Sequence, residues 1–304
     1  PRLRPNEMIV VNMRLPRVIL AALVGAVLAI AGACFQGLLK NPLADPYIIG
    51  VSSGAAVGVA LYVVVMARLG ADSAAFAAAH PTGRYLLALG KPAVAFLFAV
   101  ATMLIVYGLA RRDGRISLEG FLLAGVVVGA FMWAIVFFLM TLAQSGLHRI
   151  AFFLMGNLQQ TSWTTIAVLC VFAAVGIPVL YAFARDLNLM LLGEEPAIHL
   201  GVRVESLKHV MVAGASLITA AAVSAAGIIG FAGFIVPHIM RRIVGPDHRL
   251  LLPCACLAGA AFLIFADTLA RTLLGANEIP TGVVTALIGA PFFCHLLRKR
   301  RIEG

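Results

Sequence analysis

Residues 18–39 read VILAALVGAVLAIAGACFQGLL, an apolar run that contains no Asp, Glu, Lys or Arg. A helix needs about 20 such residues to cross about 30 Å of hydrocarbon. Comparable runs follow at residues 46–67, 92–110, 120–148, 150–184, 209–240, 250–266 and 279–297. The pattern predicts an all-α bundle of about eight to nine membrane-spanning helices.

The whole chain has the composition of a membrane protein. Of its 304 residues, 62% are hydrophobic and 12% are charged, and the mean hydropathy is +1.02. Soluble domains carry about 25% charged residues, so a soluble fold is excluded. We expect a single transmembrane domain over residues 1–304, with lipid as its surroundings.

The net charge of +10 comes from basic residues between the apolar runs, which is the positive-inside pattern and not a nucleic-acid surface. If the tail at 298–301 is cytoplasmic, alternate crossings place residues 241–249, 185–208 and 111–115 on the same side. The basic residues between 2 and 17 then fall outside, which is anomalous. One further helix upstream of this sequence would return the terminus to the cytoplasm.

The segment between Lys208 and Arg241 must cross and return, because both of its ends fall on the cytoplasmic side. It is too short for two spans of about 20 residues each. The glycine-rich run at 227–233 and Pro237 mark where a helix breaks and turns. We therefore expect residues 207–240 to form one full helix and one short or broken helix.

Ionisable residues are scarce inside the apolar runs. Asp267 lies well inside one, and Arg271 follows at i+4, a spacing typical of a local ion pair. Secondary transporters use intramembrane Asp, Glu or His chains, and a membrane enzyme needs a nucleophile with its base, so the sequence disfavours both alternatives. The sequence has no GxxxxGK[ST] phosphate loop, and its five cysteines lack metal-ligand spacing.

One segment predicted to be cytoplasmic, Gly193–Gly201, has the features of a short amphipathic helix, with Pro196 near its start. Its apolar positions share one face and its charged positions another, namely Ala197, Leu200 and Val204 against Glu194, Glu195 and Arg203. Such a helix can sit in a groove of a partner. We interpret residues 186–206 as coupling helices.

Several motifs, spread in order over nearly the whole chain, carry a family resemblance. They are RLPR at 14–17, Gln36 followed by NPLADP at 41–46, IGVSSGA at 49–55, MGNL at 155–158, GEEPAIHLG at 193–201, GFAGFIVPH at 230–238 and IPTGVVT at 279–285. In these motifs the chain resembles the permease subunits of type II ABC importers, which take up ferric siderophores, haem or cobalamin. The resemblance implies about ten helices per subunit, the first of them upstream of this sequence.

The resemblance also implies the partners of the chain. Such permeases form homodimers in the bacterial inner membrane and bind two ATPase subunits, which hold ATP and magnesium, so no cofactor is expected in this chain. A periplasmic binding protein delivers the chelate. We expect haem or a ferric siderophore as the cargo, with cobalamin as the alternative.

Site residues follow from the resemblance by position. The family's arginines that meet glutamates of the binding protein correspond to Arg14, Arg17 and Arg271. Apart from Glu7, no carboxylate in the same segment is close enough in sequence to neutralise both Arg14 and Arg17. Both are therefore expected to be unpaired cations at the outer mouth.

The gates and the ATPase contact are assigned in the same way. The constriction on the cytoplasmic side corresponds to Asn41 and Leu43, and the outer constriction to Ala143 and Gln144, where this chain departs from the family's polar pair. The ATPase contact corresponds to residues of the 193–201 motif, namely Gly193, Glu194, Ala197, Leu200 and Gly201.

Overall fold

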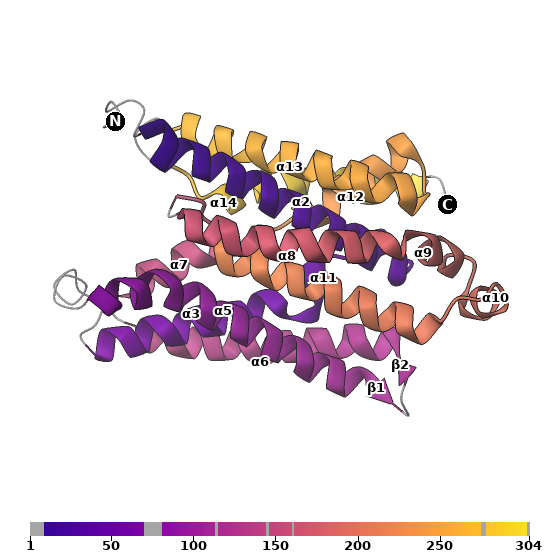
Figure 1. Cartoon of the computed structure of the whole chain (residues 1–304), viewed down its shortest axis with the longest axis horizontal. Helices are drawn as coiled ribbons and strands as arrows, with labels where there is room; N and C mark the ends of the chain where they lie inside the picture. The colour runs from indigo at the N-terminus through magenta and orange to yellow at the C-terminus, as the bar shows by residue number, and fades with distance from the viewer. Residues whose placement is uncertain are drawn as a thin grey trace.

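The computed structural model describes residues 9–69, 81–112, 115–143, 146–159, 161–274 and 278–302. The chain folds into a helical bundle with one small hairpin (Figure 1). The helices, after a π-helical turn at Val10–Arg14, are α2 (Leu15–Leu38), α3 (Val51–Arg68), α5 (Pro81–Ala110), α6 (Leu118–Leu142), α7 (Leu147–Leu154), α8 (Trp163–Ala182), α9 (Ala184–Met190), α10 (Glu194–His199), α11 (Val204–Ala226), α12 (Ala232–Val244), α13 (His248–Thr272) and α14 (Thr281–Ile302).

The hairpin joins α5 to α6. Its strands are β1 (Arg111–Arg112) and β2 (Arg115–Ile116), which pair antiparallel with Arg111 opposite Ile116. The next residue, Ser117, caps α6, because its hydroxyl oxygen accepts a hydrogen bond from the Gly120 amide. The all-α prediction is therefore confirmed, apart from these four strand residues.

Within the described residues, seven helical segments are long and apolar enough to cross a membrane. They are Val10–Leu38, Val51–Arg68, Gly90–Ala110, Leu118–Leu142, Trp163–Ala182, Val204–Ala226 and His248–Thr272. The last predicted run holds a shorter apolar helical stretch, Thr281–Cys294. The chain is thus a multi-pass membrane protein, and its described residues hold seven such segments where the sequence predicts about eight to nine.

Helix α2 forms the centre of the bundle, with most of its residues buried. It crosses α13 so closely that a Cβ atom on Gly25 would lie 2.1 Å from the Gly259 carbonyl oxygen. A Cβ atom on Gly32 would lie 1.6 Å from the Gly233 carbonyl oxygen, so α12 approaches the same helix equally closely. Small residues allow such backbone contact in lipid, where apolar burial no longer drives helix association.

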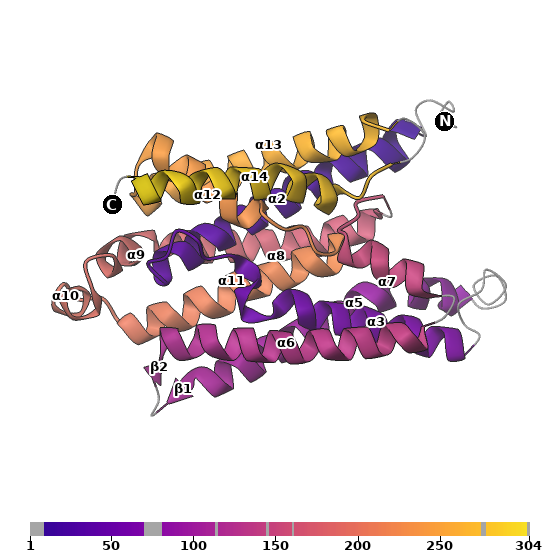
Figure 2. The ribbon, with the colours of Figure 1, turned by 180° about the vertical axis from the view of Figure 1, so that it is seen from behind.

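The two ends of the bundle carry different connections. The hairpin, α9, α10 and the end of α14 lie at one end, which we call the α10 end (Figure 1). The start of α2 and α7 lie at the opposite end, the α7 end, as the reverse view also shows (Figure 2). The sequence predicts that residues 111–115, 185–208 and 298–301 share one side, and their elements do share one end.

Two non-helical segments in the described part of the bundle bear on the candidate site. The first break follows α11, where Gly227 and Phe231 have φ values of 74° and 67° before the short helix α12 begins. This break lies where the sequence predicts it. The second separates α2 from α3 over residues 39–50, with Gly50 at φ 77° and a 3-10 turn at Pro46–Ile49. The apolar runs 18–39 and 46–67 predict a connection at 40–45, but the continuous run 46–67 does not indicate that this break extends to Gly50.

Candidate functional site

The two breaks contact each other, and side chains satisfy their free backbone groups. The Tyr47 hydroxyl donates to the Ile229 carbonyl oxygen at 3.0 Å and accepts from the Ile229 amide at 3.3 Å. The Gln36 side-chain amide donates to the Phe234 carbonyl oxygen at 3.0 Å. Irregular backbone at membrane depth is tolerated only where protein buries it or where it lines a water-filled cavity. Here protein buries the paired breaks, since Ile49 and Ile229 are at most 1% exposed.

The predicted gate residues Asn41 and Leu43 lie in the second break, directly after α2. The Asn41 side-chain oxygen accepts from the Leu43 amide at 2.9 Å, which closes a local turn. Asn41 is exposed and Leu43 is half-buried, so both side chains are accessible at the surface of this chain. Their role as a constriction stays a prediction.

The predicted outer gate fits the structure less well. Ala143 caps the end of α6 and is only 2% exposed, so its side chain is packed inside the chain instead of facing a pathway. Gln144 lies outside the described residues. The expectation that Ala143 faces the pathway is not supported by its burial.

At the α7 end, Arg17 is the centre of a buried network. Its Nε lies 3.0 Å from both carboxylate oxygens of Asp267, and its Nη1 lies 2.7 Å from Glu278 Oε2. Asp267 also accepts from the Thr281 hydroxyl at 3.0 Å and lies 3.3 Å from Arg271 Nε. The network joins the start of α2, the end of α13 and the start of α14.

This network corrects the expectation that Arg17 is an unpaired cation. The side chain of Arg17 is 8% exposed, and its carboxylate partners come from segments about 250 residues away, which the sequence argument did not consider. Arg271 is also engaged, through the i+4 ion pair with Asp267 that the sequence predicts. Arg14, one turn before Arg17, is exposed. Of the three predicted docking arginines, Arg14 is thus the one that a partner can reach without breaking a buried pair.

Glu278 is the accessible edge of the network. It accepts hydrogen bonds from Arg17 Nη1 and from the Gln159 side-chain amide, both at 2.7 Å. The hydrogen bond from Arg17, together with that from Gln159, lowers the pKa of Glu278 below its ordinary value. Glu278 is therefore a carboxylate that stays ionised at neutral pH, with Arg17 and half-buried Arg271 as its neighbouring cations.

At the α10 end, the predicted amphipathic helix forms, but its faces differ from the prediction. Ala197 is completely buried against the rest of the chain, whereas Ile198 and Leu200 are 57% and 58% exposed. The sequence argument grouped Ala197 with Leu200 and missed Ile198. Helix α10 has only six residues, and Leu200 already lies beyond its end, so ideal helical spacing does not apply there.

The predicted glycines Gly193 and Gly201 bracket α10. Their φ values are 131° and 87°, in a region of backbone conformation that side chains other than glycine rarely adopt. Glu194, the first residue of α10, forms an ion pair with Lys208 of α11 at 2.8 Å. In the described residues, no group of three or more His, Cys, Asp or Glu side chains is arranged to hold a metal ion.

Comparison with known proteins assigns the chain to a family. A model of the FecCD transport family matches residues 4–299. The cobalamin import system permease protein BtuC of Halobacterium salinarum is 44% identical over 98% of this chain and 75% of its own length. The hemin transport system permease protein HmuU of Yersinia pestis is 40% identical over 95% of this chain and 83% of its own length.

More distant relatives and a solved structure agree with this assignment. The iron(3+)-hydroxamate import system permease protein FhuG of Bacillus subtilis is 32% identical over 97% of this chain and 84% of its own length. The solved inward-facing structure of a metal-chelate type ABC transporter matches with a TM-score of 0.84 and 33% identity, over 98% of this chain and 90% of its own. The chain therefore belongs to the FecCD transport family.

Proposed function

We propose that the chain is the permease subunit of an ABC importer that moves a metal chelate across the cytoplasmic membrane. The observation that carries the proposal is the state of Asp267. Among the acidic residues of the seven described spans, Asp267 is the one that does not lie in the first turn of its helix. Arg17 and Arg271 neutralise its charge. A carboxylate paired in this way is poorly suited to carry protons or sodium ions, so energy must come from a partner.

The proposed partner at the α10 end is an ATPase, one for each copy of the chain in a homodimer. The exposed apolar side chains Leu192, Ile198 and Leu200 project from the α9–α10 segment and are 57% to 65% exposed. A short helix that presents apolar side chains fits a groove on a soluble partner. This support revises the predicted contact surface, because buried Ala197 cannot take part in it.

The proposed partner at the α7 end is a binding protein that delivers the chelate. Arg14 is exposed there, and a homodimer would present two copies of it. An exposed guanidinium group favours carboxylates on a partner, since the planar group binds them in a bidentate manner. Arg17 supports the surface indirectly, by fixing α2 against α13.

The proposed cargo is a metal tetrapyrrole, which means a corrin such as cobalamin or a porphyrin such as haem. The relatives named for cobalamin and hemin are 44% and 40% identical to the chain, whereas two permeases named for iron(3+)-hydroxamate are 32% and 36% identical. Both cargoes hold their metal in a tetrapyrrole ring, whereas a hydroxamate siderophore holds iron through oxygen ligands. The proposed cargo is narrower than the expectation from the sequence, which was haem or a ferric siderophore, with cobalamin as the alternative.

Measurement of the uptake of each candidate chelate tests this assignment. The permease, its ATPase and its binding protein are reconstituted in proteoliposomes with radiolabelled cyanocobalamin or hemin, and ferrichrome serves as the hydroxamate control. We expect ATP-dependent accumulation of one tetrapyrrole and no accumulation of ferrichrome. Uptake of ferrichrome in preference to both tetrapyrroles would contradict the proposed cargo.

A further inference from the structure

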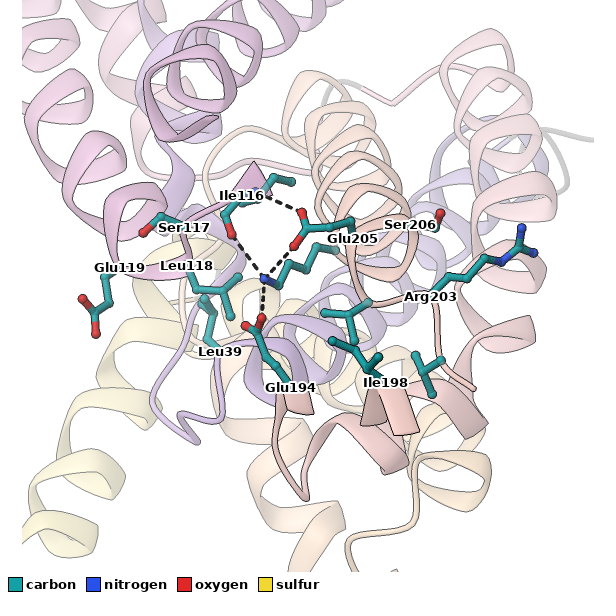
Figure 3. Close-up of a pocket in the computed structure, with 13 residues that line it drawn as sticks. Leu39, Ile116, Ser117, Leu118, Glu119, Glu194, Ile198, Arg203, Glu205 and Ser206 are labelled. Atoms are coloured by element: carbon teal, nitrogen blue, oxygen red, sulfur yellow. Dashed lines mark hydrogen bonds and ion pairs between the residues drawn. The ribbon is translucent and has the colours of Figure 1, made fainter. Parts of the chain in front are cut away.

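Lys208 places a buried charge where three elements of the α10 end meet. Its side chain is only 4% exposed, and its Nζ lies 2.8 Å from Glu194 Oε2, 3.1 Å from Glu205 Oε1 and 3.3 Å from the Ile116 carbonyl oxygen (Figure 3). These acceptors belong to α10, α11 and β2. The three protons of the ammonium group therefore each have an acceptor.

Glu205 strengthens the same junction from the other side. Its second carboxylate oxygen accepts from the Ile116 amide at 3.0 Å, so Lys208 and Glu205 together bind both backbone groups of one hairpin residue (Figure 3). The hairpin is continuous with α5 and α6. A single cluster of side chains thus ties α10, α11 and the α5–α6 connection together.

Helix α10 depends on this tie for its orientation. Ala197 is its one buried residue among six, so apolar packing alone holds it weakly. Gly193 and Gly201 stand at either side of the helix with positive φ values, and a Cβ atom on Gly201 would meet nothing within 4 Å. Glycine gives the backbone more freedom than any other residue. The two glycines are natural pivots, and the Glu194–Lys208 ion pair restrains rotation about them.

Open space beside the tie gives α10 room to move. A cavity of about 960 Å³ separates α10 from the hairpin and the start of α6, and Glu194, Ile198, Ser117 and Lys208 are among its lining residues (Figure 3). Local backbone hydrogen bonds, from Gly193 to Met190 and from Gly201 to Ile198, hold the two ends of α10. The Glu194–Lys208 ion pair is the charged contact that joins this short helix directly to α11.

We propose that Lys208 is a positioning residue that couples α10 to α11 and to the hairpin. When the ATPase displaces α10, the Glu194–Lys208 pair passes that displacement to the membrane helices. Without the pair, α10 would rotate at Gly193 and Gly201 and the membrane helices would not move with it. This inference rests on the proposed function, because it requires α10 to contact the ATPase. It assigns a role to a lysine that the family motifs quoted above do not contain.

The test compares neighbouring carboxylates in the complete, reconstituted importer. Glu194→Gln removes the charge partner of Lys208, and Glu195→Gln makes the same chemical change one residue later, where no ion pair is found among the described contacts. The measured quantity is the amount of chelate moved per ATP hydrolysed, with co-purification of the ATPase as the measure of assembly. We expect Glu194→Gln to lower this ratio about tenfold, which lies within the usual range of coupling between linked sites.

Two lysine variants complete the test. Lys208→Met should lower the ratio as Glu194→Gln does, whereas Lys208→Arg, which keeps the charge and the donors, should restore most of it. A residue that served only stability would lower complex yield and ATPase activity together and leave the ratio unchanged. If Lys208→Met does not assemble, Glu194→Gln decides alone, because Lys208 still keeps Glu205 in that variant.

The failure of this inference is distinguishable from the failure of the proposed function. If the wild-type complex shows no ATP-dependent uptake, the proposed function is wrong. If wild-type uptake is normal and Glu194→Gln keeps the wild-type ratio, or Glu195→Gln loses as much as Glu194→Gln, the coupling role of Lys208 is wrong.

Discussion

Arg17 and Asp267 stand 250 residues apart in the chain and meet in a buried ion pair, with 2.9 Å between Arg17 Nη2 and Asp267 Oδ1. The pair fixes the start of α2 against the end of α13. Thr281 and Glu278 extend it to the start of α14, so three membrane segments share one electrostatic contact at the α7 end.

Removing the carboxylate of Asp267 should destabilise the fold. The Asp267→Asn variant leaves the Arg17 guanidinium buried with one charged partner fewer, and loss of one member of a buried pair costs about 3–5 kcal/mol of unfolding free energy. The change is measured as a fall in the thermal unfolding midpoint of the detergent-solubilised protein. Glu278→Gln is the matched control, and it should cost less because Glu278 is 33% exposed. Equal losses in the two variants would contradict this ranking.

Stability should depend on pH through Glu278. Because its pKa is lower in the folded than in the unfolded protein, its contribution is fully present above the ordinary carboxyl value of about 4.5 and disappears as the pH falls through the folded value. We expect the unfolding midpoint of the wild type to fall more steeply than that of Glu278→Gln between about pH 5 and about pH 3. Identical pH profiles would show that Glu278 contributes nothing.

The same substitution should have opposite effects at a close helix crossing and at an open position of another helix. Gly25→Ala places a methyl group 2.1 Å from the Gly259 carbonyl oxygen, so α2 and α13 must separate, at a cost of about 1–3 kcal/mol. Gly108→Ala in α5 meets nothing within 4 Å and should stabilise its helix by about 0.5–1 kcal/mol. Thermal unfolding of both variants measures the difference. A Gly25→Ala protein as stable as wild type would mean that α2 and α13 are not in backbone contact.

Arg14 and Arg17 should respond differently to charge reversal. Arg14→Glu leaves the buried network intact and should slow association with the binding protein, with the difference from wild type shrinking at high salt. Arg17→Glu places a negative charge beside Asp267 and should reduce folded yield. Surface plasmon resonance at low and high salt measures the first effect, and size-exclusion profiles measure the second. Unchanged association of Arg14→Glu at every salt concentration would remove Arg14 from the docking surface.

The ATPase contact can be mapped with one charge at two neighbouring positions. Ile198→Asp places a carboxylate on the exposed face of α10 and should abolish co-purification of the ATPase while the permease stays folded. Ala197→Asp buries the carboxylate inside the chain and should disturb the α9–α10 segment itself. Normal ATPase binding by Ile198→Asp would show that this face does not form the contact.

The sequence was sufficient to predict the helical class and that the connections at 111–115 and 185–208 lie at the same end of the bundle. Apolar runs such as 18–39 leave few alternatives in lipid, because backbone polar groups must be satisfied within the segment. The break at 227–233 was also predictable. The segment is too short for two full spans, and its glycine-rich run marks where the helix ends. The connection at 40–45 follows from the end of one apolar run and the start of the next, but its extension to residue 50 was not predictable, because Pro46–Ile49 are apolar and merge with the span that follows.

The site residues divide in a similar way. The i+4 pair of Asp267 and Arg271 follows from helix geometry and is confirmed. The pairing of Arg17 with Asp267 depends on how α2 crosses α13, and no local pattern encodes it. The orientation of α10 was also not predictable, because six residues between two glycines do not fix which face turns inward. That is why Ala197, expected on the contact face, is buried, whereas Ile198, for which no role was expected, is exposed.

The central claim is that ATP hydrolysis by a partner, and not an ion gradient, drives this permease. It is tested most directly by tetrapyrrole accumulation in proteoliposomes that contain the permease and ATPase, with the binding protein and chelate outside and ATP inside the vesicles or omitted. We expect accumulation only with hydrolysable ATP, and no change in accumulation when ionophores collapse the proton and sodium gradients. Accumulation that persists without ATP and disappears with the ionophores would contradict it.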